Sequence, residues 1–256
     1  MTSVSSGYIR LILTLGGIAA VVQPVPAQDT ATLNIRAITR YTLKSDRTGD
    51  MAAAIKEYNE LLKKAHWDKS YSIWRSVTGP GEMIRVDYYT KWSDLDANVA
   101  ADPKMKNYEA DRIRITARIN QSFAGTTRII DVVNQKASLP RTSEMPKMIQ
   151  VWTAHVKQDK MREAIDLETN EYAPAVKSAG IKTYVFSVTR MGGPANEVRA
   201  AMGIENWAAL DQPNPIRKAM GDEKYRAFSA KMDALLEDYR YDVYRYDREL
   251  SYIPAR

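Results

Sequence analysis

The second half of this chain repeats the first half. Matching residues recur 111 positions later in the sequence, and a Trp-x-x-Leu-Asp motif recurs 115 positions later. The matched pairs are Tyr41 and Trp152, residues 76–78 and 187–189, Asp131 and Asp242, and Trp92 and Trp207. This offset exceeds the roughly 20 to 50 residue period of solenoid repeats. The repeat therefore indicates two copies of a whole domain in one chain.

Each copy shows the same order of predicted elements, strand–helix–strand–strand–helix–strand. Alternating apolar residues predict the strands, and apolar residues spaced by three or four positions predict the helices. The first copy gives strand 34–43, helix 51–65, strands 71–78 and 82–90, helix 103–119 ended by Gly125, and strand 127–133. The second gives strand 148–156, helix 161–176 closed by Gly180, strands 183–190 and 197–204, helix 225–236, and strand 239–246.

This order predicts an α+β protein built from two tandem ferredoxin-like units, each with both helices on one face of an antiparallel sheet. The units span residues 28–134 and 147–256, joined by a linker at 135–146 where Pro140 and Pro146 interrupt the periodic patterns. The open sheet face needs a cover, and the second copy supplies it at high effective concentration. We therefore expect the units to pair sheet to sheet as an intrachain α/β barrel.

Residues 1–27 have the pattern of a secretory signal peptide. Arg10 precedes an apolar run from Leu11 to Val22, and small residues lead up to a cleavage site near Ala27. The run is shorter than the roughly 20 residues that span a bilayer, so a permanent membrane anchor is not expected. We expect export to the periplasm or the extracellular space.

Composition excludes several kinds of site. The chain has no cysteine, so it has no disulfide, thiol nucleophile or thiolate metal site. Its formal net charge is +6, but basic and acidic residues are interleaved, which favours a mixed solvated surface over a nucleic-acid site. Neither histidine stands in a metal-binding spacing, and we expect neither a bound metal nor a resident cofactor. A homodimer is allowed but not required, because the copies can pair with each other.

The sequence resembles the dimeric α/β-barrel superfamily, especially its NIPSNAP-like and antibiotic-biosynthesis-monooxygenase-like branches. The resemblance rests on residues 38–41, the helix from Met51, residues 71–75 before a glycine turn, and the strand that leads into 92–96. It implies a barrel around a pocket, in a superfamily that includes cofactor-free oxygenases and haem-binding enzymes. The matching motifs are architectural, so the resemblance implies no catalytic residue and no particular chemistry.

Several polar and aromatic residues are candidates for a site. His155 lies three residues after Trp152, so strand alternation directs these two side chains to opposite faces. If Trp152 packs under the helices, His155 faces the barrel interior, although a strand-end histidine at the rim is the structural alternative. His66 follows the first helix, where an exposed histidine is common.

Trp74, Tyr244 and Tyr246 are, together with His155, candidate ligand-binding residues, because pockets are mostly apolar with a few placed polar groups. Core packing is the alternative for all three aromatic residues, and we expect packing for the recurring Trp92 and Trp207. Arg85 and Asp87 share a face through strand alternation. They are candidate catalytic residues if that face is interior, and a surface pair if it is the solvent edge.

These residues support more than one function. The first is binding of a small, partly apolar molecule in the barrel interior. The second is a cofactor-free monooxygenase, in which His155 or the Arg85/Asp87 pair acts on a phenolic substrate. Haem binding through His155 or His66, and a structural role with a filled interior, are further alternatives.

Overall fold

A computed structural model describes residues 34–78, 81–96, 99, 102–141 and 144–254. The expected signal peptide and residues 79–80 of the first glycine turn lie outside this part of the chain. Eight antiparallel strands form a closed barrel in the order β1-β3-β2-β8-β5-β7-β6-β4. Among the described residues, no helix is long and apolar enough to cross a bilayer.

The first unit contains four strands and two main helices. Its elements are β1 (Ile35–Leu43), η1 (Ser45–Arg47), α1 (Thr48–Lys64), β2 (Tyr71–Ser76), β3 (Glu82–Tyr89), η2 (Trp92–Asp96), η4 (Pro103–Tyr108), α2 (Glu109–Gln121) and β4 (Phe123–Val133). Gly125 lies inside β4, so the expectation that it ends the preceding helix is wrong. The helix ends at Gln121, and Ser122 caps it by donating its hydroxyl to the carbonyl of Arg118.

The second unit follows the same order with an interrupted first helix and an added short helix. Its elements are β5 (Met148–Val156), α3 (Met161–Leu167), η5 (Glu168–Tyr172), α4 (Ala173–Ser178), β6 (Tyr184–Met191), β7 (Glu197–Ile204), η6 (Trp207–Leu210), α5 (Pro215–Met220), α6 (Asp222–Leu235) and β8 (Leu236–Tyr252). Gly180 has a φ of 70°, as expected for a glycine that closes a helix.

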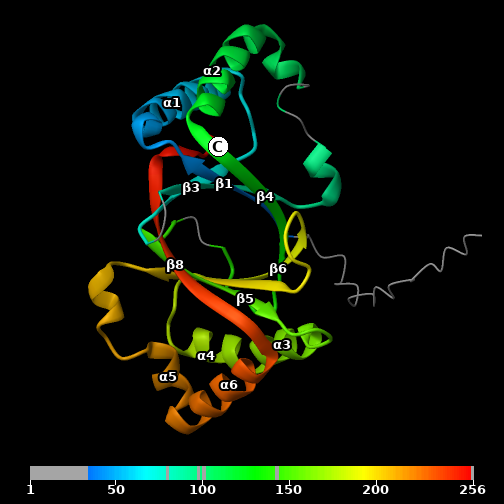
Figure 1. Ribbon diagram of the computed structural model, residues 1–256, viewed down its shortest axis with the longest axis vertical. Helices are drawn as coiled ribbons and strands as arrows, with labels where there is room; N and C mark the ends of the chain where they lie inside the picture. The colour runs from blue at the N-terminus through cyan, green and yellow to red at the C-terminus, as the bar shows by residue number, and fades with distance from the viewer. Residues whose placement is uncertain (1–33, 79–80, 97–98, 100–101, 142–143, 255–256) are drawn as a thin grey trace, which may run out of the picture.

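The two sheets form the wall of the barrel, and each unit's helices cover the outside of its own sheet (Figure 1). The sheets have the orders β4-β1-β3-β2 and β8-β5-β7-β6. The long strand β8 joins them on one side by pairing with both β5 and β2, and β4 pairs with β6 on the other. The structure therefore has the expected architecture, two ferredoxin-like units pairing sheet to sheet within one chain.

The barrel interior contains a buried apolar cluster and a buried ion pair. An apolar cluster there includes Trp74, Tyr244 and five aliphatic residues, with Tyr88 and Tyr246 packed against it. Beside this cluster, the Arg36 guanidinium donates to Asp131 at 2.9 and 2.5 Å and to Ser187 at 2.7 Å. Because the Asp131 carboxylate is fully buried, this matched pair avoids the cost of an isolated buried charge.

The strand registers refine the sequence repeat. Tyr71 is opposite Asp87 in the first unit, and Tyr184 is opposite Met202 in the second. When all strand pairs of the two units are matched in this way, each residue of β1, β2 and β4 corresponds to the residue 113 positions later in the chain. Each residue of β3 corresponds to the residue 115 positions later. The offset of 111 is therefore wrong by two residues in three strands. A shift of two preserves the face on which each side chain lies, so the face predictions are unaffected.

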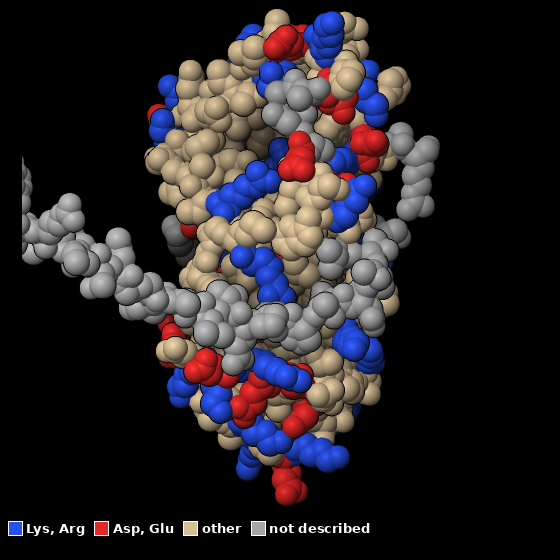
Figure 2. Space-filling view, turned by 90° about the vertical axis from the view of Figure 1, so that its right-hand side faces the viewer, with Lys and Arg blue, Asp and Glu red and all other residues tan. Residues whose placement is uncertain are grey.

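Trp92 and Trp207 are not core residues, contrary to our expectation. They lie on the short helical turns η2 and η6 and are 37% and 44% exposed. On the face that Figure 2 shows, acidic and basic side chains are interspersed, as the interleaved sequence predicts.

Candidate functional site

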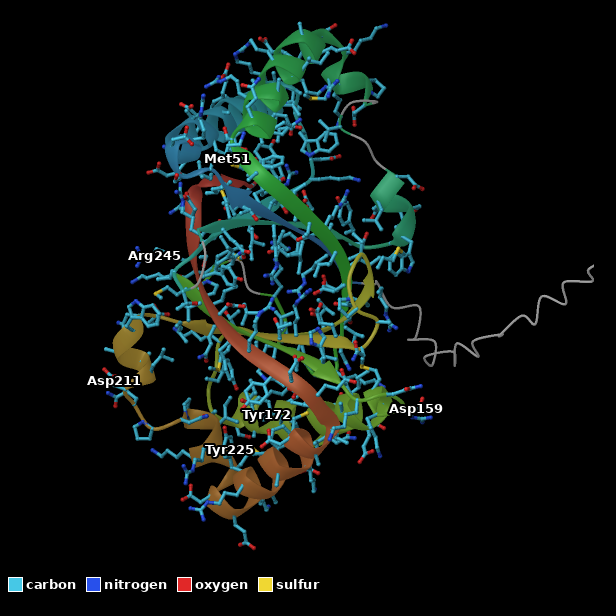
Figure 3. All side chains as sticks on the ribbon, viewed as in Figure 1. Met51, Asp159, Tyr172, Asp211, Tyr225 and Arg245 are labelled. Atoms are coloured by element: carbon cyan, nitrogen blue, oxygen red, sulfur yellow. The ribbon has the colours of Figure 1, made fainter. Side chains whose placement is uncertain are left out.

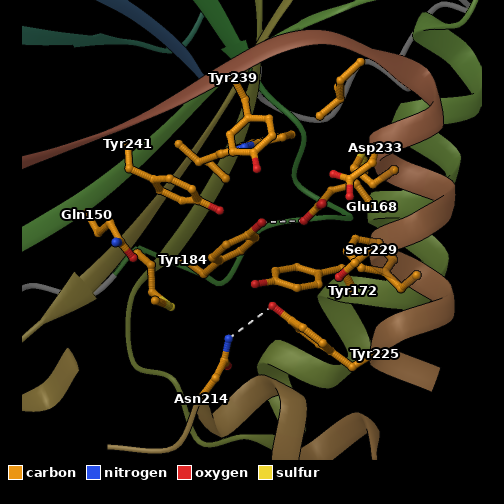
Figure 4. Close-up of a pocket in the computed structure, with 16 residues that line it drawn as sticks. Gln150, Glu168, Tyr172, Tyr184, Asn214, Tyr225, Ser229, Asp233, Tyr239 and Tyr241 are labelled. Carbon is orange, nitrogen blue, oxygen red and sulfur yellow. Dashed lines mark hydrogen bonds between the residues drawn. The ribbon is translucent and has the colours of Figure 1, made fainter. Parts of the chain in front are cut away.

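A cavity of about 400 Å³ lies in the second unit, between the outer face of its sheet and its helices (Figure 4). Sixteen residues line it, and seven of them are aromatic. The lining residues are Gln150, Trp152, Glu168, Tyr172, Tyr184, Ala200, Met202, Asn214, Tyr225, Phe228, Ser229, Met232, Asp233, Leu236, Tyr239 and Tyr241. Its volume is in the range of sites that hold small organic ligands. The cavity thus lies on the opposite face of the sheet from the interior position that we expected.

Comparison of the two units explains why the second one has this cavity. The strand registers equate Arg85 with Ala200, and Asp87 with Met202. In the first unit, Arg85 and Asp87 form a partly buried ion pair of 2.7 Å on the helix-facing side of the sheet, and a cavity of about 40 Å³ remains beside them. In the second unit, Ala200 and Met202 stand in place of this ion pair, which leaves space between the sheet and the helices.

A buried carboxyl group lies in the cavity wall. Glu168 is 3% exposed, and its carboxylate accepts a hydrogen bond from the Tyr184 hydroxyl. Burial raises the pKa of Glu168 to about 7, although the Tyr184 hydrogen bond acts in the opposite direction. A carboxyl with this pKa can give or take a proton near neutral pH.

The helix that carries Glu168 is irregular at this point. Glu168–Tyr172 forms a π-helical turn between α3 and α4. Such turns are rare and occur often at functional sites. The first unit has a related contact on a regular helix, because Tyr71, the equivalent of Tyr184, donates its hydroxyl to Asn59 of α1. The two units thus share a tyrosine hydrogen-bonded to a helix, but only the second has an acid as acceptor.

Aromatic rings form most of the remaining wall. Tyr172 stacks on Phe228 with ring centroids 4.9 Å apart. Figure 3 labels Tyr172 and Tyr225 among the helices of the second unit, and both line the cavity (Figure 4). The Asn214 amide donates to the Tyr225 hydroxyl at 3.3 Å. Tyr239 and Tyr241 are 53% and 57% exposed, so the cavity opens to solvent along this part of β8.

The hydroxyls of Tyr172, Tyr184 and Tyr241 remain protonated near neutral pH. Burial raises the pKa of Tyr172, and the nearby Glu168 carboxylate raises it further. The pKa of Tyr184 is raised mainly by burial and, to a smaller extent, by the Glu168 carboxylate. Burial also raises the pKa of Tyr241. The Tyr172 and Tyr241 hydroxyls can therefore donate hydrogen bonds to a ligand, whereas that of Tyr184 already donates to Glu168.

Three of the expected ligand-binding residues lie together in the barrel interior, away from this cavity. Trp74 packs on Tyr246 with ring centroids 5.1 Å apart, and Tyr244 is buried in the same cluster. The Trp74 indole donates to Ser72 at 2.9 Å. Tyr239 and Tyr241 lie on one face of β8 and Tyr244 on the other, as strand alternation predicts. A ligand-binding role for the interior residues stays a prediction.

The two histidines lie apart from the cavity. Trp152 packs against the helical core of its unit, so His155 is on the interior face of β5, as alternation requires. It lies near the strand end with its Nδ1 2.7 Å from Asp238 and its Nε2 3.7 Å from Glu197. His66 is exposed just after α1. The structure thus places His155 at the rim of the barrel.

Arg85 and Asp87 share a face as expected, but this face is neither the interior nor the open solvent edge. It is the side covered by the helices of the first unit, where the Arg85 guanidinium lies 3.9 Å from the centre of the Tyr71 ring. Burial lowers the pKa of Arg85, but the Asp87 carboxylate and the nearby Tyr71 and Tyr41 together outweigh this effect, and the pKa is raised. The pair fills its own site and does not reach the cavity of the second unit.

No protein-family model matches the sequence, and no curated protein matches it. Solved structures do match. A protein from Lactobacillus acidophilus NCFM, proposed to be a monooxygenase, has a TM-score of 0.60 at 9% identity over 87% of this chain and 97% of its own. An anthrone oxidase-like protein has a TM-score of 0.56 at 13% identity over 84% and 92%.

The chain therefore shares the fold of these two proteins, an α+β fold with a closed barrel of eight antiparallel strands. A NIPSNAP family protein from Agrobacterium tumefaciens C58 also matches, at 19% identity, over 38% of this chain and 89% of its own, with a TM-score of 0.32. At these identities the likeness concerns the fold and leaves the chemistry of the site to this chain's own residues.

Of the cavity wall, only Trp152 was among the residues considered from the sequence as lining a cavity, and Glu168 and the tyrosines of the wall were not expected. One signal points to them. The offset of 115, which the Trp92 and Trp207 motifs provide, equates Arg85 with Ala200 and so marks a place where a large charged side chain is lost.

Proposed function

We propose that this protein binds a small, partly apolar molecule in the cavity between the sheet and helices of the second unit. The observation that carries the proposal is the 400 Å³ space lined by seven aromatic side chains and a few polar groups. Mostly apolar walls with a small number of placed hydrogen-bonding groups are typical of small-molecule sites. The barrel interior is less suitable, because Trp74, Tyr244 and their neighbours pack there in a buried apolar cluster.

A double variant tests this function. Ala200→Arg with Met202→Asp copies the first unit's Arg85 and Asp87 into the second unit, where the new pair would fill the cavity. Mass spectrometry of small molecules that co-purify should detect a compound with the wild type and not with this variant. Met191→Asp is the matched control, since it adds an aspartate at an exposed position outside the cavity. Equal recovery of the compound from the double variant, folded by circular dichroism, would contradict the proposal.

A cofactor-free oxygenase is the second candidate, and Glu168 is the observation that favours it. A base with a pKa of about 7 in an aromatic cavity can remove a proton from a phenolic or anthrone-type substrate, whose carbanion then reduces dioxygen. For an anthrone, one dioxygen gives the anthraquinone and one water. Glu168 thus replaces His155 and the Arg85/Asp87 pair as the proposed base, because these residues do not line the cavity.

The test of this activity is anthraquinone formation from 1,8-dihydroxyanthrone in air. The wild type should accelerate it with a rate that rises through pH 7, and Glu168→Gln should remove the acceleration while binding is retained. A rate equal to that of buffer alone would exclude the oxygenase and leave the binding function in place.

The cavity does not fit haem held by a histidine. Its lining, as described, includes neither histidine, because His155 is at the barrel rim and His66 is exposed on the other unit. It also contains no arginine or lysine that could pair with haem propionates. An absorbance spectrum of the purified protein is therefore expected to lack a Soret band.

We also propose that the protein is exported after cleavage near Ala27. The proposal rests on the order of Arg10, the apolar run and the small residues that precede Gln28.

A further inference from the structure

We propose that the molecule bound in the second-unit cavity is an organic cation, an amine or guanidine joined to an apolar ring. This inference rests on the binding function proposed above and specifies the chemical class of the ligand. Two independent observations carry it, namely the charges of the cavity wall and the contents of the corresponding space in the first unit.

The described cavity wall contains acids and aromatic rings but no basic side chain. Glu168 and Asp233 are its only ionisable carboxyl groups, and arginine, lysine and histidine are absent from the sixteen lining residues. Figure 4 shows Asp233 and Glu168 on the helix side of the cavity, which both residues line, and the tyrosine rings around the remaining space. The face of an aromatic ring attracts cations, and tyrosine and tryptophan are among the best rings for this contact.

An anion would be disfavoured in the same place. It would lose its hydration shell and meet two acidic groups without a compensating positive charge. A neutral ring compound would pack against the walls but would not use Glu168 or Asp233 as counter-ions. The wall therefore favours a positively charged ligand over a neutral one, and a neutral one over an anion.

The first unit shows what occupies the equivalent space when the chain fills it by itself. There, the Arg85 guanidinium lies 3.9 Å from the centre of the Tyr71 ring and 2.7 Å from the Asp87 carboxylate. The second unit keeps the ring as Tyr184 but has Ala200 in place of the arginine. The second unit thus lacks both the built-in cation and its aspartate partner, keeps the aromatic ring, and has acids from its helices, Glu168 and Asp233, in the cavity wall. A ligand that supplies a cation would restore the interaction that the first unit makes internally.

Isothermal titration calorimetry at pH 8 with three phenols of similar size tests the inference. The probes are tyramine, a cation, 4-ethylphenol, which is neutral, and 3-(4-hydroxyphenyl)propionate, an anion. We expect tyramine to bind about 10-fold more tightly than 4-ethylphenol, which corresponds to about 1.4 kcal/mol. We expect the anion to bind more weakly than either.

Two nearly isosteric variants identify the source of the preference. Glu168→Gln and Asp233→Asn should each lower the affinity for tyramine and leave that for 4-ethylphenol within twofold. The larger loss is expected for Glu168, which is buried, whereas Asp233 is exposed.

The outcomes separate the two proposals. If 4-ethylphenol or the anion binds as tightly as tyramine, or if the variants weaken tyramine and 4-ethylphenol equally, the cation inference is overturned and the binding function remains. If none of the three probes binds at millimolar concentration, both proposals are overturned. The double variant Ala200→Arg with Met202→Asp should bind none of the probes, because its introduced guanidinium fills the cavity. Undiminished tyramine binding by this variant would also overturn both proposals.

Discussion

Replacing Glu168 by glutamine should remove a pH dependence of stability that the wild type carries. The pKa of Glu168 rises from the ordinary value of 4.5 to about 7 on folding, mainly because the carboxyl group is buried. Between these two pH values the folded protein holds a proton that the unfolded chain has released. The stability that this group contributes is therefore highest below pH 4.5 and falls as the pH rises to about 7.

The size of the effect follows from the same two values. One pKa unit corresponds to about 1.4 kcal/mol, so the difference between 4.5 and about 7 corresponds to about 3 kcal/mol of unfolding free energy. Glutamine cannot ionise, and its carbonyl oxygen can still accept the Tyr184 hydrogen bond. Relative to the wild type, the variant should gain about 3 kcal/mol between pH 4 and pH 8.

Urea unfolding followed by circular dichroism, at intervals from pH 4 to pH 8, measures this difference. Other titrating groups contribute equally to both proteins and cancel in the comparison. Glu163→Gln is the matched control, because it makes the same substitution at an exposed carboxylate of the preceding helix α3. A difference between wild type and Glu168→Gln that stays constant with pH would refute the assignment of a buried, protonated carboxyl.

Three further predictions concern other parts of the molecule. Asp131→Asn should lower the free energy of unfolding by about 3 to 5 kcal/mol in urea, because it leaves the Arg36 guanidinium without its buried partner, and a loss below about 1 kcal/mol would contradict this view. Trp74→Ala should lower the free energy of unfolding by about 3 to 5 kcal/mol, because core packing is lost. At a temperature where the variant is folded, its tyramine affinity in calorimetry should be unchanged, and a selective loss of affinity would instead place the ligand in the barrel interior. Mass spectrometry of the protein secreted by an expression host should find Gln28 as the first residue, and an intact N-terminus would argue against export.

The architecture could be predicted from the sequence because each copy repeats the same pattern and the sheet faces need a cover. Strand alternation also predicted which side chains share a face, as for Arg85 with Asp87 and Trp152 against His155. The register was harder. Short identities such as the Ser-Val-Thr triplet favoured an offset of 111, whereas the strand pairs require 113, and alternation cannot detect a shift of two.

The position of the cavity could not be predicted, because it depends on what is missing. Large aromatic residues such as Trp74 attracted attention, but such residues also fill cores, and Trp74 does so here. Ala200 and Met202 carry no chemical signal by themselves and become informative only beside Arg85 and Asp87. The π-helical turn at Glu168 similarly has no distinctive spacing, since the sequence pattern predicts one continuous helix from 161 to 176.

The most direct test of the account is a crystal structure of the protein soaked with tyramine. Electron density for the ligand should appear between β5–β7 and the helices of the second unit, beside Glu168 and Asp233, and not beside Arg85 in the first unit. Density inside the barrel next to Trp74 or Tyr244, or equal occupancy in both units, would contradict the claim that the loss of one ion pair created the binding site.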